Sequence, residues 1–124
     1  MTSTPLATLD ASPLRQDGDV LGFDYQDRLG RDHKGLVIRW NDELKAYRNL
    51  CPHWSTPLDE DGDRLFDHGS RALICQTHGA LFEPASGQCI SGPCFGEALK
   101  ELRVERAEGS EIEIFRAGLV LSES

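Results

Sequence analysis

The stretch that decides the fold is GLVIRWNDELKAYRNLCPH, residues 35–53. Residues 35–40 are rich in β-branched and aromatic side chains, and residues 44–50 alternate between apolar and polar ones, so both segments indicate strands. Asn41-Asp42 between them is a typical turn pair. Cys51 and His53 follow the second strand directly. This stretch therefore predicts an antiparallel hairpin that leads into a thiol and an imidazole.

A second segment is built in the same way. Residues 71–74 indicate a short buried strand, and Cys75-Gln76-Thr77-His78 follows it, with Gly79 next. Residues 54–74 separate the two segments. Each segment thus offers one thiolate and one imidazole on a short arc, as a shared metal centre would require.

The remaining pattern is also strand-like. Residues 1–17 are polar, contain Pro5 and Pro13, and are predicted to form an N-terminal tail or first turn. Residues 18–124 are predicted to form one domain, with the ligands in about 50–95. Helix signals are weak, so the fold class expected is all-β. Further strands are expected at 20–25, 80–82, 99–105, 111–115 and 119–121, with a tight turn at Ala117-Gly118 before the last.

Composition narrows the classes of function. The 124 residues include 21 Asp and Glu against 13 Lys and Arg, a formal net charge of −8. This balance argues against binding nucleic acid, whose phosphates favour Lys and Arg; it suits docking on a basic protein surface, or only solubility. No apolar run approaches the roughly 20 residues of a membrane span, and no secretory signal is seen. A cytoplasmic protein without a membrane partner is expected, whose reduced cysteines favour metal ligation over disulfides.

The spacing Cys51-x-His53 and Cys75-x2-His78 resembles that of the Rieske [2Fe–2S] proteins. The resemblance extends over about residues 18–116 and includes four further motifs: Pro57-Leu58, His78-Gly79-Ala80-Leu81-Phe82, Ser86-Gly87-Gln88-Cys89 and Gly92-Pro93. It implies a Rieske-like antiparallel β-sandwich or barrel with a cluster-binding subdomain formed by two loops.

The resemblance also implies how the ligands share one [2Fe–2S] cluster. Cys51 and Cys75 would hold the inner iron, and His53 and His78 would hold the outer one. Neutral imidazoles in place of two thiolates make such a cluster easier to reduce. Backbone amides of the loops and of the Pro93 segment would donate hydrogen bonds to the sulfurs.

The sequence departs from the family pattern in two ways. The segment between the ligand pairs is longer than usual, and the surplus is expected in the acidic stretch 59–70. The extra, disulfide-forming cysteines of respiratory Rieske proteins are missing, because Ser55-Thr56 and Thr77 occupy those neighbourhoods. The chain therefore resembles the ferredoxin and oxygenase branch. Members of that branch have reduction potentials toward the lower end of the Rieske range of about −150 to +300 mV.

Other readings of these residues stay open. Structural zinc is an alternative for the four ligands, although Cys-x-His is unusual for zinc. Cys89 and Cys94 are expected to be buried thiols, with extra ligands or a redox pair as alternatives. His33 and His68 are expected to be solvated.

The function predicted is one-electron transfer from a flavin-dependent reductase to a terminal oxygenase or similar acceptor. No catalysis is expected, because the chain has no G-x-G-x-x-G fingerprint and only His33 and His68 remain for a second iron site. The alternatives are an electron-relay subunit of a larger redox complex, or a redox-sensing interaction module that would use Cys89 and Cys94.

Overall fold

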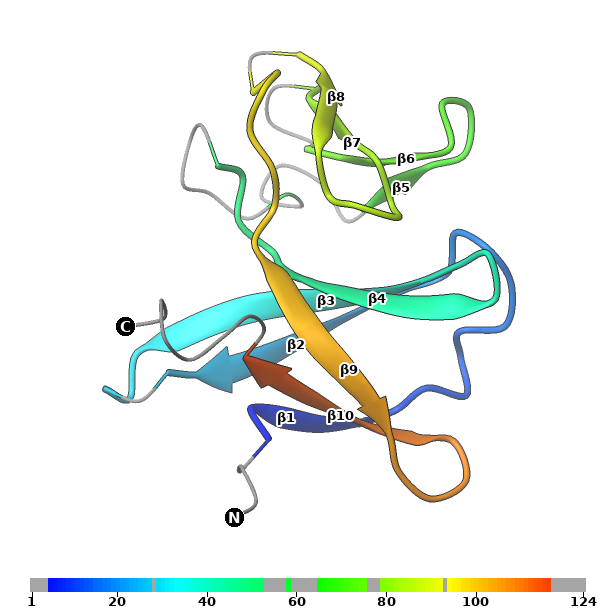
Figure 1. The fold of residues 1–124 in the computed structure, drawn as a ribbon, viewed down its shortest axis with the longest axis vertical. Helices are drawn as coiled ribbons and strands as arrows, with labels where there is room; N and C mark the ends of the chain where they lie inside the picture. Colours follow the sequence, from blue (N-terminus) through cyan, green and yellow to red (C-terminus); the bar gives the residue numbers. More distant parts are fainter. Residues whose placement is uncertain are drawn as a thin grey trace.

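The computed structural model describes residues 5–27, 29–52, 58, 65–75, 79–92 and 94–116, and these form two antiparallel sheets (Figure 1). The larger sheet has the strand order β1-β10-β9-β4-β3-β2 and the smaller has β5-β6-β7-β8. The all-β prediction is confirmed. The strands are β1 (Ala7–Asp10), β2 (Val20–Gln26), β3 (Asp32–Trp40), β4 (Glu43–Arg48), β5 (Phe66–Asp67), β6 (Ala72–Ile74), β7 (Leu81–Phe82), β8 (Cys89–Ser91), β9 (Glu101–Arg106) and β10 (Glu111–Arg116).

The predicted hairpin is strands β3 and β4. Trp40 pairs with Glu43 across a two-residue turn, in which Asn41 has φ 52° and Asp42 has φ 64°. Two positive φ values in a two-residue turn match the right-handed twist of the strands, and Asn and Asp tolerate them best after glycine. The turn fixes the register of the hairpin and hence the faces on which its side chains lie.

Strand β3 is buried on both faces, and this joins the two parts of the molecule. Leu36 and Ile38 point to a core shared with the small sheet, whereas Val37 points to the core of the large sheet. On β4, Tyr47 likewise points to the core shared with the small sheet, and Ala46 points to the core of the large sheet. The period-2 alternation of a strand thus supplies side chains to both cores.

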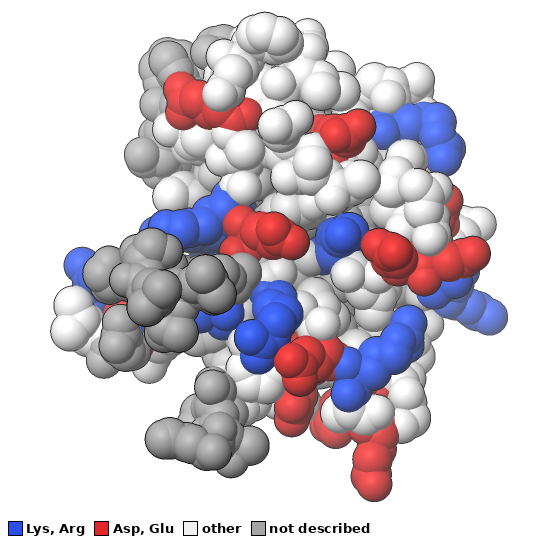
Figure 2. All heavy atoms as spheres, in the orientation of Figure 1, with Lys and Arg blue, Asp and Glu red and all other residues white. Residues whose placement is uncertain are grey.

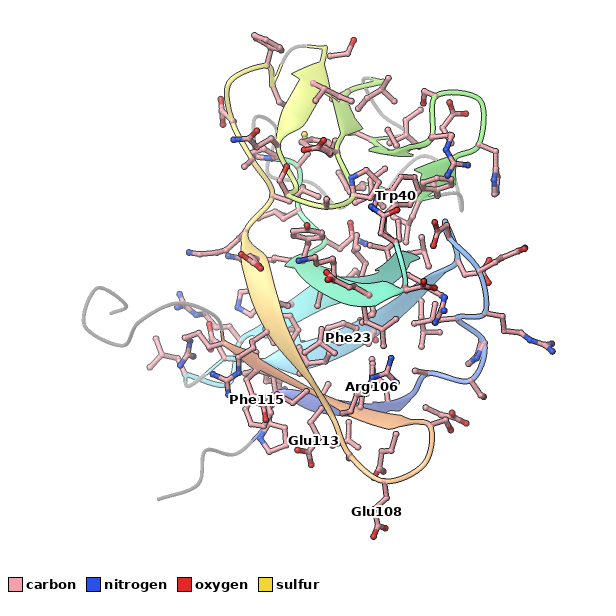
Figure 3. All side chains as sticks on the ribbon, turned by 45° about the vertical axis from the view of Figure 1, so that its right-hand side comes forward. Phe23, Trp40, Arg106, Glu108, Glu113 and Phe115 are labelled. Carbon is pink, nitrogen blue, oxygen red and sulfur yellow. The ribbon has the colours of Figure 1, made fainter. Side chains whose placement is uncertain are left out.

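The large sheet curls until β1 approaches β2, so that it forms a nearly closed barrel. Phe23 lies inside it, while Trp40 lies at the junction with the small sheet (Figure 3). The Trp40 ring contacts Phe66 of β5 at a centroid distance of 5.8 Å, and the Arg71 guanidinium lies 4.9 Å from it. The small sheet is therefore fastened to the barrel by aromatic packing.

Tyr47 makes a polar link between the same two parts. Its hydroxyl donates a 2.8 Å hydrogen bond to the carbonyl of Pro84, and its side chain is fully buried. Burial raises the pKa of the Tyr47 phenol, so the hydroxyl keeps its proton. Its ring also packs so closely on Gly87 that a Cβ there would lie 2.8 Å from it.

We expect Tyr47→Phe to lower the free energy of unfolding by about 1–2 kcal/mol, because it keeps the ring but leaves the Pro84 carbonyl without this donor in a buried site. The measurement is the urea midpoint of the cofactor-loaded protein. Tyr25→Phe is the matched control, since the Tyr25 hydroxyl makes no hydrogen bond with the described part of the chain, and its midpoint should barely move. Equal midpoints for the two variants would contradict the link.

The N-terminal segment differs from the prediction. Ala7–Asp10 were expected in a tail or first turn but form β1, which pairs with Glu111–Ile114 of β10. Four residues of alternating burial give too short a pattern to recognise, and their partner is remote in sequence. The strand expected at 119–121 and the turn at Ala117-Gly118 lie outside the described residues. Where the chain is described, no helix is long and apolar enough to cross a membrane.

Candidate metal centre

The first predicted ligand segment leaves the end of β4 and is closed at its base by Asn49. This side chain is only 4% exposed, and its Oδ1 accepts a 2.7 Å hydrogen bond from the backbone N–H of Leu58. The backbone N–H of Asn49 in turn donates to the carbonyl of Lys34 on β3. Cys51 lies between these points and is fully buried. A buried amide thus anchors both ends of the first loop to the sheet.

The second segment begins at Cys75, directly after β6. The Cys75 N–H donates to the carbonyl of Ala80 at 2.8 Å, and the Gly79 N–H donates back to the carbonyl of Cys75 at 2.7 Å. Gly79 has φ 74°, a conformation that a residue without a side chain adopts readily. These bonds close the second loop at its base and return the chain into β7.

A third segment, described at residues 92 and 94–97, packs against the second loop through Gly92 and Ala80. A Cβ on Gly92 would lie 2.8 Å from the Cα of Ala80, so glycine permits this close approach. Two backbone hydrogen bonds shape the segment, from Phe95 N to Gly92 O and from Glu97 N to Cys94 O. Cys94 is held fully buried, with its Sγ 3.3 Å from the Sγ of Cys51. Sequence reasoning missed this contact.

The structure brings two of the four predicted ligands, Cys51 and Cys75, into the core between the sheets. His53 and His78 lie outside the described residues, as do Trp54, Pro57 and residues 59–64 of the acidic stretch. Over the described ranges, no group of three or more His, Cys, Asp or Glu side chains is arranged to hold a metal ion. The four-residue ligand set stays a prediction.

Cys89 and Cys94 are both buried, as predicted. No disulfide joins any of the four cysteines. The Cys89 thiol donates to the carbonyl of Ser91 at 3.3 Å, whereas Cys94 meets Cys51. The local contacts therefore give the idea of a Cys89–Cys94 redox pair no support.

His33 was expected to be solvated, but its side chain is only 17% exposed. Its Nδ1 lies 2.9 Å from the Arg48 guanidinium, and its Nε2 lies 2.9 Å from Asp27 Oδ2. Arginine can only donate, so Nδ1 accepts and Nε2 donates to Asp27. This hydrogen bond, with those from Arg31, holds the pKa of Asp27 well below its usual range. His68 is exposed, as expected.

Charge is unevenly spread over the described residues on the face that Figure 2 shows. Acidic and basic side chains mix there over the large sheet, whereas the described part of the small-sheet end carries few charges. Two of the exposed large apolar side chains lie near that end, namely Ile90 at 48% and Phe95 at 74%. Phe95 immediately follows Cys94. An exposed aromatic side chain thus lies in the same segment as the thiol that contacts Cys51.

Comparison with known proteins identifies this architecture. A model of the Rieske [2Fe–2S] domain matches residues 11–115. Because this match covers most of the chain, the chain belongs to the Rieske [2Fe–2S] domain family, an iron–sulfur class of protein. Its two antiparallel sheets and its buried cysteines in loops agree with this membership. A comparison with curated protein sequences gave no match.

Solved structures share the fold over most of the chain. The ferredoxin of carbazole 1,9a-dioxygenase from Nocardioides aromaticivorans IC177 is 26% identical, with a TM-score of 0.63 over 94% of this chain and 100% of that one. A chain in the complex of reduced oxygenase and oxidized ferredoxin in carbazole 1,9a-dioxygenase is 27% identical, with a TM-score of 0.63 over 92% and 98%. The terminal oxygenase from N. aromaticivorans IC177 is 22% identical over 84% of this chain but 28% of its own, with a TM-score of 0.60, and shows the fold alone.

The predictions of a Rieske-type cluster and of an electron carrier are confirmed by this membership and by the ferredoxin neighbours. The residues present fit the cofactor. Cys51 and Cys75 are buried thiols of the kind that iron–sulfur clusters use as thiolate ligands, each in a loop closed by hydrogen bonds.

Proposed function

We propose that Cys51, His53, Cys75 and His78 hold the [2Fe–2S] cluster and that the chain carries single electrons to a terminal oxygenase. When bound, the cluster supplies one reversible electron. The ligand assignment is supported by the family match across both loops and by the burial of the two cysteines. The choice of two cysteines and two histidines follows the family motif.

The partner is proposed from the solved structures. Two of the similar structures contain a ferredoxin of carbazole 1,9a-dioxygenase, and one of these two is a complex of ferredoxin with the oxygenase. Both are slightly more than 25% identical to this chain and cover nearly all of it. The electron donor is proposed from the family resemblance alone: a flavin-dependent reductase in the cytoplasm, where the four thiols would remain reduced.

The single observation that carries the docking proposal is the apolar surface beside Cys94. Phe95 is 74% exposed in a turn one residue from the thiol that touches Cys51. In the described part of the small-sheet end, residues 65–75, 79–92 and 94–99, the charged side chains are three acidic ones and one basic: Asp67, Glu83, Glu97 and Arg71. Exposed aromatic residues at the centre of a weakly charged patch are typical interface anchors. We expect the oxygenase to bind here.

The test is anaerobic stopped-flow mixing of the reduced protein with the oxidised terminal oxygenase from N. aromaticivorans IC177. We expect reoxidation of the ferredoxin at a rate that rises with oxygenase concentration. Phe95→Asp should slow this second-order rate at least about tenfold, because losing an aromatic anchor costs about 2 kcal/mol of binding.

Leu29→Asp is the matched control. Leu29 is also exposed, at 76%, but it lies in the turn between β2 and β3 of the large sheet. Its rate should stay within about twofold of wild type, since a surface substitution away from the interface changes little. If the Nocardioides ferredoxin reacts and this cluster-loaded protein does not, delivery to an oxygenase of this kind is wrong.

A further inference from the structure

If Cys51 is a ligand of the cluster, its role decides which of the two sulfurs, Cys51 or Cys94, donates the hydrogen bond between them. The two sulfurs are 3.3 Å apart, within hydrogen-bonding distance for sulfur, and either could donate as far as their positions show. A cysteine that ligates iron does so as a thiolate, without a proton. Cys94 must then be the donor.

We propose that the Cys94 thiol donates a hydrogen bond to the Cys51 sulfur and thereby raises the reduction potential of the cluster. Reduction adds negative charge to the cluster and its ligands, so a donor aimed at a ligand sulfur stabilises the reduced form more than the oxidised form. Hydrogen bonds to the sulfurs are one of the determinants of potential in iron–sulfur proteins. This inference rests on the proposed role of Cys51.

The surroundings of Cys94 favour such a role over accidental contact. Its side chain and that of Cys51 are both fully buried, and a low dielectric strengthens the electrostatic effect of a hydrogen bond. Its backbone is fixed by the hydrogen bond from Glu97 N to Cys94 O and by the close packing of Gly92 on Ala80. The hydrogen bond and the packing of the third segment therefore hold the thiol in position.

The experiment is a redox titration of the cluster-loaded protein, followed by electron paramagnetic resonance, for wild type, Cys94→Ala and Cys94→Ser. At a fixed solution potential, we expect the ratio of reduced to oxidised protein to fall about tenfold in the alanine variant, a 59 mV decrease for a one-electron couple. Serine keeps a donor, so Cys94→Ser should shift the ratio by less than alanine does. Cys89→Ala is the control, because Cys89 is also a buried thiol but donates to the Ser91 carbonyl. The reduction potential of the cluster in this variant should match that of wild type.

The outcomes separate this inference from the ligand assignment. If wild-type protein gives no rhombic signal of a histidine-ligated [2Fe–2S] centre, the ligand proposal fails. If wild type and Cys94→Ala both give that signal at the same potential, only the inference about Cys94 fails. Loss of the signal in Cys94→Ala alone would also overturn the inference, because Cys94 would then be needed to hold the cluster.

Discussion

Cys75→Ala should abolish the cluster. Removing one of four ligands leaves a buried site that lacks a thiolate, so the purified variant is expected to contain no acid-labile sulfide and to give no rhombic resonance signal after reduction. A cofactor present at 1,000 times its Kd adds about 4 kcal/mol to the folded state. For a domain of this size, losing it should lower the melting temperature by roughly 10–20 °C.

Cys89→Ala is the matched control for this prediction. Cys89 is buried to a similar degree, at 5% exposure, and lies in the same core. Its substitution removes one sulfur and a weak hydrogen bond to Ser91, which we expect to cost about 1 kcal/mol with the cluster retained. Both variants are compared by iron and sulfide content, resonance spectrum and melting curve. A cluster that survives in Cys75→Ala with a wild-type spectrum would refute the ligand role of Cys75.

The sequence predicted the parts of the fold that local patterns control. The hairpin of β3 and β4 depends on residues adjacent in sequence and on the turn Asn41-Asp42, so pattern and turn chemistry agree. The position of Cys75 directly after a strand was predicted for the same reason, whereas Asn49 and Leu50 separate Cys51 from the end of β4. Short ligand motifs beside strand ends can be recognised from a single sequence, because both signals are local.

What sequence could not predict depends on contacts between remote segments. β1 pairs with β10, which lies at the other end of the described chain. Asn49 had no feature to mark it as the anchor of the first loop, because its role depends on a hydrogen bond across that loop. His33 sits in a polar stretch, and only the pairing of β2 with β3 and of β3 with β4 brings Asp27 and Arg48 to its ring. Tertiary structure decided each of these outcomes.

The proximity of Cys94 to Cys51 is another feature that depends on a contact between remote segments. Gly92-Pro93 was recognised as a segment that would contribute to the cluster site through its backbone. That a side chain of this segment reaches a ligand sulfur depends on how tightly the segment packs on Ala80. Gly92 controls that distance, and this leads to the second large effect.

Gly92→Ala should lower the free energy of unfolding by about 2–6 kcal/mol. The residue has φ 104°, where an added side chain costs about 1–3 kcal/mol. A Cβ would also lie 2.8 Å from the Cα of Ala80 and 3.2 Å from its Cβ, so backbone must shift, at a further 1–3 kcal/mol or so. The shift would move the third segment away from the second loop, and we expect faster loss of the cluster.

Gly96→Ala isolates the contact from the backbone strain. Gly96 has nearly the same φ, 97°, but a Cβ there would meet nothing within 4 Å. Its substitution should therefore cost only the conformational part, about 1–3 kcal/mol. The difference between the two variants, measured as urea midpoints and as rates of cluster loss, reports the packing of Gly92 on Ala80. Equal losses would show that this contact does not hold the third segment, and the position of Cys94 would then need another explanation.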